Sequence, residues 1–186
     1  MDAPCHQNLS FHKSPFGNGH KCLRVIWALA WLLLFRPSPR PLHAWRRLLL
    51  RLFGARIGRN VRIDASCRVF VPWNLEVGDW CVIGPGTDLH TVGKIVIGQH
   101  TMVSQYCHLC AGTHDPRRAN LPLLAQNIAI GQSVWICAGA FVGPGVAVGE
   151  GAVVGARAVA FQEVKPWSVV MGNPCKAVFP RRIVAE

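Results

Sequence analysis

A six-residue periodicity between positions 130 and 159 constrains the fold of this chain more than any other feature. A branched aliphatic residue returns every sixth position, usually with glycine behind it and a small residue four places on. The aliphatic positions are Ile130, Ile136, Val142, Val148 and Val154. A period of six fits neither the 3.6-residue period of a helix nor simple strand alternation. It is typical of a chain that turns a corner after each short strand.

Three such strands close a triangular coil of about 18 residues, and coils stack at the ~4.8 Å strand spacing. The aliphatic residue then points into the prism, and the small residue points inward near a corner, where little volume is left. Glycine after the aliphatic residue suits a corner with unusual backbone angles or a close approach. The sequence therefore predicts a mainly β fold, a left-handed parallel β-helix of about five coils with an N-terminal helical segment and a protruding loop.

The repeat and its flanks divide the chain into four segments. Residues 1–20 show no periodicity and predict an irregular arm, and residues 21–54 predict a helical segment. The β-helix is expected over residues 55–162, and residues 163–186 form a C-terminal tail. After the last rung, the segment from Phe161 to Trp167 is expected to leave the prism.

Two features interrupt the rungs. The register slips by two positions around Pro72 and again before Ile97. Between Leu109 and Ile130 there are 21 residues where whole rungs need 18, so part of this segment must leave the prism. We expect an external loop near residues 111–127.

The helical segment contains two different patterns. Residues 23–35 are apolar on nearly all sides, but 13 residues are too few for a span of about 20. After a break at residues 36–41, a basic amphipathic helix is expected, with arginines on faces other than its apolar stripe (Arg46, Arg47 and Arg51 against Leu42, Trp45, Leu48, Leu49, Leu52 and Phe53). Two interpretations stay open. The helices pack on the prism or a neighbouring subunit, or they lie on an anionic membrane with arginines among the headgroups.

The chain is basic, with a formal net charge of +11, and only 16% of its residues are charged. Such basicity suits an anionic partner, which includes a phosphate-bearing cofactor, an anionic lipid surface and a nucleic acid. Many of the arginines lie on or beside predicted helices with apolar stripes, and no recognised nucleic-acid module is present. We therefore expect no nucleic-acid partner.

The eight cysteines do not predict disulfides or a metal site. Cys67, Cys81 and Cys107 fall on the small inward position, where cysteine acts as a compact hydrophobe. Cys107 and Cys110 form a C-x-x-C pair, but within a six-residue rung they face different directions. No secretory pattern opens the chain, so reduced thiols in a cytoplasmic protein are the simpler interpretation.

His114 is the candidate for chemistry in the external loop. Loops on rigid scaffolds tend to carry function, and His114 is the one residue in this loop able to exchange a proton near neutral pH. A neutral imidazole beside a bound alcohol takes the hydroxyl proton as the oxygen attacks an acyl carbon, an effect typically worth about 10²–10⁴ in rate.

Several motifs together carry a family resemblance. The rungs, the loop Cys110–Asp115, the strand Val134–Ile136 and the segment Gly172–Lys176 resemble the hexapeptide-repeat acyltransferases. Within them, the chain is most similar to the sugar O-acetyltransferases of the maltose, galactoside and nodulation type. Residues 34–45 and 71–75 further resemble colanic acid biosynthesis acetyltransferases. The resemblance covers residues 21–182.

The resemblance implies a homotrimer that uses acetyl-CoA, held along the groove between adjacent prisms, and no metal. It implies that His114 acts as general base, so that the acceptor oxygen attacks the thioester directly, without an acyl-enzyme. The acceptor would be a sugar hydroxyl during exopolysaccharide assembly. A lipid-linked sugar acceptor would rationalise the basic amphipathic segment, and would place the protein in the cytoplasm, peripheral to the inner face of the membrane.

Further site residues follow from the resemblance. Asp88 is a candidate for holding the acceptor hydroxyl, and Asp115 either orients the imidazole or caps a turn. The residues expected at the cofactor are Trp135, Ala138, Asn173, Pro174 and Lys176, with Lys176 placed to meet a phosphate. One departure matters: the asparagine that related enzymes often carry before the histidine loop is missing from residues 83–86. Acceptor identity therefore cannot be carried across.

Two alternatives remain from other functional classes. A zinc carbonic anhydrase of the γ type uses the same prism, and His90, His108 and His114 could suggest its ligands. Its H-x4-H spacing is absent, because five residues separate His108 and His114. A non-enzymatic structural β-helix is the second alternative, but it needs neither a protruding histidine loop nor the Gly-Asn-Pro segment.

Overall fold

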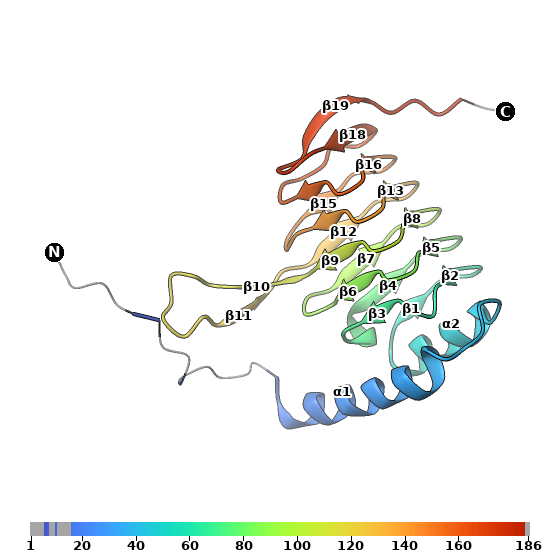
Figure 1. Cartoon of the computed structure of the whole chain (residues 1–186), viewed down its shortest axis with the longest axis vertical. Coiled ribbons are helices and arrows are strands. Elements are labelled where there is room, and N and C mark those ends of the chain that lie inside the picture. The colour runs from blue at the N-terminus through green and yellow to red at the C-terminus, as the bar shows by residue number, and fades with distance from the viewer. Residues whose placement is uncertain (1–5, 8–9, 11–15, 185–186) are drawn as a thin grey trace.

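The protein is a triangular parallel β-helix that carries helices at one end and a hairpin at its side (Figure 1). The computed structural model describes residues 6–7, 10 and 16–184. The predicted β-helix is confirmed, with about six coils rather than the five expected. Most of the arm expected over residues 1–20 lies outside the described residues, and the first helix already begins at Asn18.

Three sheets form the faces of the prism. Sheet A contains β1 (Arg56–Ile57), β4 (Leu75–Val77), β7 (Ile95–Ile97), β12 (Ile128–Ile130) and β15 (Ala147–Val148). Sheet B contains β2 (Arg62–Ile63), β5 (Val82–Ile83), β8 (Met102–Val103), β13 (Trp135–Ile136), β16 (Val153–Val154), β18 (Ser168–Met171) and β19 (Lys176–Pro180). Sheet C contains β3 (Arg68–Val69), β6 (Asp88–His90), β9 (His108–Cys110), β14 (Phe141–Val142) and β17 (Val159–Ala160).

The aliphatic and small positions of the repeat form the core, as predicted. Ile136 stacks between Val103 and Val154 in register and is fully buried. The cysteines predicted to point inward are buried too, and burial raises the pKa of the Cys107 thiol to about 11. Such thiols stay protonated at neutral pH and behave as small hydrophobes.

The backbone of the rungs separates two requirements, close approach and unusual backbone angles, that the sequence pattern assigned to the same glycine. Glycine after the aliphatic residue provides close approach: a Cβ on Gly98 would lie 2.5 Å from the backbone nitrogen of Gln132 in the next coil. The left-handed backbone falls two residues later instead, for example at His100, with φ 56°, and at Gly139, with φ 67°. The corner therefore needs positive φ and the glycine before it needs space.

The segment from Phe161 to Trp167 does not leave the prism, so that prediction is wrong. Val164 is buried and bridges Val148 in parallel, which places it on sheet A of a further coil. The chain then continues into β18, which pairs in parallel with β16, and β19 folds back antiparallel on β18. This extra coil accounts for the sixth layer.

Helices close the other end of the prism (Figure 1). They are α1 (Asn18–Ala30), the π-helical segment η2 (Trp31–Phe35) and α2 (His43–Leu52), and a short 3-10 helix, η3 (Pro72–Asn74), lies at the first register slip. The first coil has no coil beneath it to pair with, so its carbonyls need other donors. Helix side chains supply them on all three faces: Arg51 to Ile57 and Gly58, Arg47 to Val61, Arg46 to Ile63, Trp31 to Cys67 and Trp27 to Val69.

Helix α2 turns its basic face, and not the whole of its apolar stripe, toward the prism. Its arginines face the prism and bind backbone carbonyls, whereas Leu48 and Leu52 of its apolar stripe are exposed. On α1 and η2, Trp27 and Phe35 are buried while Leu29, Leu32 and Leu33 are exposed. The closed end of the prism therefore presents an apolar outer surface. Among the described residues, no helix is long and apolar enough to cross a membrane.

Candidate active site

The external loop is a two-stranded hairpin that projects from one corner of the prism (Figure 1). Strand β10 (Gly112–His114) pairs antiparallel with β11 (Leu123–Ala125), and His114 lies opposite Leu123. The hairpin follows β9 of sheet C and leads into β12 of sheet A, so it leaves from the corner between these faces. His114 is exposed on it, turned neither into the prism core nor into the hairpin.

The ring of His114 is oriented by a backbone carbonyl. Its Nδ1 lies 2.7 Å from the oxygen of Leu121. A carbonyl can only accept a hydrogen bond, so Nδ1 carries the proton and the lone pair of the neutral ring is on Nε2. This is the tautomer that a general base needs. This role of Leu121 could not be predicted from sequence, because nothing in a leucine signals a carbonyl contact across the turn.

Leu121 itself has an unusual backbone. Its φ is 41°, in the left-handed region that aliphatic residues seldom adopt. Its amide donates to the oxygen of Arg118 at 3.0 Å, which closes the turn before β11. Such conformations persist where the surrounding structure requires them. Here the turn aims a carbonyl at the imidazole.

Asp115 is placed to hold the turn. Its carboxylate accepts from the amide of Arg117 at 3.0 Å and from the Nε of the same residue at 2.9 Å. Hydrogen bonds from the Arg117 side chain and then its amide hold the pKa of Asp115 below its ordinary value, and Arg118 lies nearby. Of the two roles left open for Asp115, the turn role is the one these contacts support, and Leu121 orients the ring.

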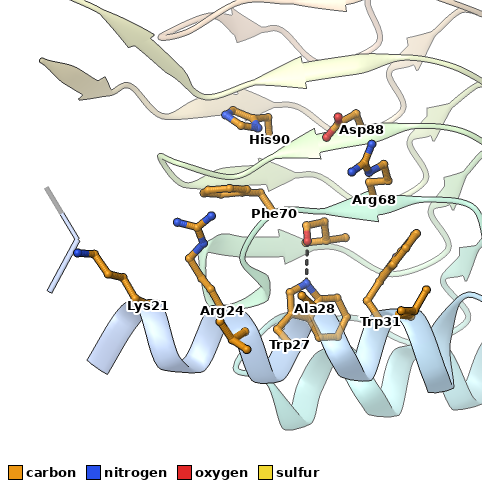
Figure 2. Close-up of a pocket in the computed structure, with 12 residues that line it drawn as sticks. Lys21, Arg24, Trp27, Ala28, Trp31, Arg68, Phe70, Asp88 and His90 are labelled. Atoms are coloured by element: carbon orange, nitrogen blue, oxygen red, sulfur yellow. Dashed lines mark hydrogen bonds between the residues drawn. The ribbon is translucent and has the colours of Figure 1, made fainter. Parts of the chain in front are cut away.

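Asp88 lies in a pocket between α1 and the lower strands of sheet C (Figure 2). The cavity has a volume of about 860 Å³. Its lining includes side chains of α1, η2, β6, β3 and the residue after β3 for which the sequence indicated no acceptor or cofactor role, namely Lys21, Arg24, Trp27, Trp31, Arg68, Phe70 and His90. No local sequence signal links these residues, because the helix and the strands meet only in the folded chain.

The residues expected at the cofactor occupy sheet B and its upper end. Trp135 on β13 is 44% exposed, and its indole nitrogen donates to the hydroxyl of Ser104 at 3.0 Å. Ala138 is half-buried at the corner after β13, and its carbonyl accepts from the amide of Arg157. The three other residues, Asn173, Pro174 and Lys176, are exposed at the turn between β18 and β19.

Exposed side chains on sheet B could hold a long, partly apolar ligand. Met102 is the register partner of Trp135 one coil below, and Met171 ends β18 near the top; both are about half exposed. They form an apolar strip along the prism, with the amine of Lys176 near its upper end. This arrangement fits the pantetheine arm and a phosphate of coenzyme A.

The hairpin and the residues expected at the cofactor lie on different sides of one chain. Sheet B is the face opposite the corner between sheets C and A from which the hairpin projects. His114 and Asp88 are on the same side, because β9, which runs into the hairpin, pairs with β6 directly. Within one chain, His114 therefore lies on the same side of the prism as the pocket with Asp88, and away from Trp135 and Lys176.

The structure gives no support to a zinc site. Among the described residues, no three histidine, cysteine or acidic side chains come together as metal ligands. The rings of His90 and His108 meet edge to face within a column of aromatic rings, with centroids 6.2 Å apart. His114 projects on the hairpin instead.

Comparisons with known proteins define the class. No protein-family model matches the chain. A hexapeptide-repeat acetyltransferase from Vibrio cholerae, solved with acetyl coenzyme A, superposes with a TM-score of 0.83 at 22% identity, over 92% of this chain and 94% of the other. A maltose O-acetyltransferase from Clostridium difficile 630 gives a TM-score of 0.79 at 22% identity, over 90% and 92% of the two chains. The fold is that of the hexapeptide-repeat acetyltransferases.

Sequence comparison places the chain more narrowly. It is 40% identical over 177 residues to WcaF of Escherichia coli K12, which is named as a colanic acid biosynthesis acetyltransferase. The match covers 94% of this chain and 97% of WcaF. The protein belongs to this family of acetyltransferases, and it is an acyltransferase.

Proposed function

We propose that the protein transfers an acetyl group from acetyl-CoA to a sugar hydroxyl during exopolysaccharide assembly. The names of its relatives support this assignment: WcaF for colanic acid biosynthesis and the structural neighbours for acetyl-CoA and maltose. The observation that carries the chemistry is the tautomer of His114, whose Nδ1 is held by Leu121.

The reaction is a direct transfer. Nε2 of His114 takes the proton of the acceptor hydroxyl as its oxygen attacks the carbonyl carbon of the thioester. The carbon–sulfur bond then breaks, the acetyl ester forms, and the thiolate leaves with the proton that His114 returns. Asp88 accepts a hydrogen bond from the acceptor sugar, and Asp115 acts on the site through the turn that it holds. No acyl-enzyme forms.

The complete site needs two chains. Trp135 and Lys176 lie on the face opposite the hairpin, so a neighbouring prism must present its sheet B to the hairpin of this one. Threefold symmetry gives every hairpin such a neighbour. A homotrimer with acetyl-CoA between adjacent prisms therefore fits the positions of Trp135, Ala138, Asn173, Pro174 and Lys176.

The helical end of the prism makes a peripheral contact with an anionic membrane. The contact surface consists of exposed apolar residues of α1, η2 and α2 (Leu23, Val25, Ile26, Leu29, Leu32, Leu33, Leu34, Trp45, Leu48 and Leu52). Positions 3 to 63 contain eleven lysines and arginines and no acidic residue. Apolar side chains inserted at the headgroup boundary and a surrounding positive field together favour anionic lipid.

Substituting two of these leucines should release the protein from vesicles. Leu29→Gln with Leu33→Gln removes apolar area from one helical face, and we expect vesicle affinity to fall about tenfold or more. Sedimentation with phosphatidylcholine vesicles, with and without phosphatidylglycerol, measures it. The matched control is Val178→Gln with Val184→Gln at the opposite end, where both valines are exposed. Equal loss in both variants, or binding that ignores phosphatidylglycerol, would contradict the proposal.

The proposed function is tested by an acceptor screen with acetyl-CoA and detection of the released thiol. Sugars, nucleotide sugars and lipid-linked sugars are the candidate acceptors, and mass spectrometry identifies the acetylated product. Release of thiol that requires a sugar and yields a base-labile acetyl ester supports O-acetyl transfer. An acetylated amine, or release without any acceptor dependence, would contradict it.

A further inference from the structure

The pocket between α1 and sheet C is preformed. Its two walls are locked together because the Trp27 indole nitrogen donates to Val69 at 2.7 Å and the Trp31 indole nitrogen donates to Cys67 at 2.9 Å. The two bonds join α1 and η2 to β3 of sheet C and to the residue before it, and Figure 2 shows the bond of Trp27. A cavity of about 860 Å³ between such walls is the size of known small-molecule sites.

The charges in this pocket are unbalanced. Lys21, Arg24 and Arg68 line it, against a single carboxylate, Asp88. Within the described residues, none of the three basic side chains donates a hydrogen bond to a protein acceptor or forms an ion pair. Burial lowers the pKa of His90, which therefore adds no charge at neutral pH. Three cations and one carboxylate leave an excess of two positive charges.

A cation–π contact fixes the position of one of these cations. The guanidinium carbon of Arg24 lies 4.2 Å from the centroid of the Phe70 ring. The centroids of the Phe70 and His90 rings are 4.8 Å apart. A guanidinium stacked through its face keeps its in-plane N–H donors available for a bidentate anion. Figure 2 shows Lys21 and Arg24 rising from α1 and Arg68 with Asp88 on the sheet wall.

We propose that this pocket binds the diphosphate of a diphosphate-linked saccharide, with the sugar beside Asp88 and the aromatic rings. The inference rests on the proposed function, whose acceptor it specifies. Two negative charges of a diphosphate match the excess of two positive charges, and arginine donors suit phosphate oxygens. The hairpin with His114 follows β9, the strand directly above the pocket strand β6, so the sugar lies on the same side of the prism as the base.

Two sources share this chemistry, a nucleotide-linked and a lipid-linked sugar. Helix α1 forms one wall of the pocket and also carries exposed Ile26 and Leu29, and η2, which follows it, carries exposed Leu32. A diphosphate held on this helix is therefore close to the apolar end of the prism, where a lipid tail could remain in the bilayer. The experiment below distinguishes the two sources.

Calorimetric binding of inorganic pyrophosphate, UDP-glucose and glucose tests the site, in the presence of saturating CoA so that the cofactor's own diphosphate does not compete. Arg68→Gln should weaken pyrophosphate and UDP-glucose binding about tenfold, the size of one charge-assisted hydrogen bond. Arg62→Gln is the matched control, because Arg62 occupies the same rung position on β2 of sheet B. We expect Arg62→Gln to change nothing.

Equal effects of the two substitutions, or glucose binding as tightly as UDP-glucose, would overturn the inference. Repeating the titration with polyprenyl-diphosphate-linked glucose in anionic vesicles identifies the source: stronger binding than UDP-glucose supports the lipid carrier, and weaker binding supports the nucleotide. Transfer kinetics separate the two proposals. If Arg68 governs pyrophosphate binding but no acceptor is acetylated, the proposed function fails alone. If neutral sugars are acetylated with an unchanged KM in Arg68→Gln, the inference fails alone.

Discussion

Replacing His114 by alanine should lower the rate of acetyl transfer by about 10²–10⁴-fold, the usual contribution of a positioned general base. The substitution removes Nε2, and with it the acceptor of the hydroxyl proton. It removes no core contact, because the ring is exposed on the hairpin. Thiol release from acetyl-CoA in the presence of the best acceptor from the screen measures the effect on kcat and KM.

His100→Asn is the matched control for this experiment. His100 is exposed at a coil corner with φ 56°, a conformation that asparagine tolerates. We expect its kcat to remain at the wild-type value, and the oligomeric state of both variants to be unchanged. A kcat for His114→Ala within threefold of wild type would exclude the histidine as the base and redirect attention to the pocket side chains.

The β-helix was predictable from sequence because each rung repeats the same short pattern of an aliphatic, a glycine and a small residue. The six-residue period fails where a coil is shorter. The inward positions Ala160 and Val164 are only four residues apart, and the spacing of six returns between Val164 and Val170. The coil still forms, because Val164 remains buried and bridges Val148. A fixed period therefore underestimates the number of coils wherever a corner is tightened.

Periodicity identified the two faces of α2 but not which of them meets the protein. The first coil leaves its backbone carbonyls unpaired, and arginine is the side chain that can reach and saturate several of them. Arg47 and Arg51 bind Val61 and Ile57 in this way. A basic helix directly before the first rung can thus be interpreted as a cap on the β-helix. The position of the arginines next to the first rung indicates this role, whereas their charge alone does not.

His114 was predictable from sequence as the candidate base, whereas its surroundings were not. His114 stood out as a titratable residue in a loop that the rung count required. Leu121 and the pocket residues carry no pattern, since Arg24 meets Phe70 and Trp27 meets Val69 across more than 40 positions of sequence. Contacts of this kind depend on how the helical segment closes the prism, which local sequence does not specify.

Arg46→Met should be the most destabilising single substitution in the helical end. Arg46 is fully buried, although the sequence pattern placed it on a face of α2 other than the apolar stripe. Its guanidinium donates to Ile63, Pro39 and Arg40 carbonyls and to the Ser38 hydroxyl, at 2.6 to 2.9 Å. Burial lowers the pKa of Arg46, and the nearby carboxylate of Asp64 opposes this shift. The hydrogen-bond acceptors around the guanidinium stabilise its buried charge.

Methionine keeps most of the volume but leaves these acceptors without a donor. Each unsatisfied buried group costs about 1–3 kcal/mol, and loss of a buried charged partner typically costs about 3–5 kcal/mol. We expect the helical end to open about 10²–10³-fold more often, which amide hydrogen exchange detects in α2. The amides of β13, stacked between β8 and β16, should keep their protection.

Arg36→Met provides the comparison, because Arg36 is exposed in the same segment and should exchange like the wild type. Arg46→Lys should fall between them, since one ammonium cannot reach all the acceptors that a planar guanidinium fork serves. Unchanged exchange in α2 of Arg46→Met would mean that the carbonyls find water or new donors without loss. In that case Arg47, Arg51 and the two tryptophans would suffice to attach the helices to the first coil, and opening of the pocket wall would not depend on Arg46.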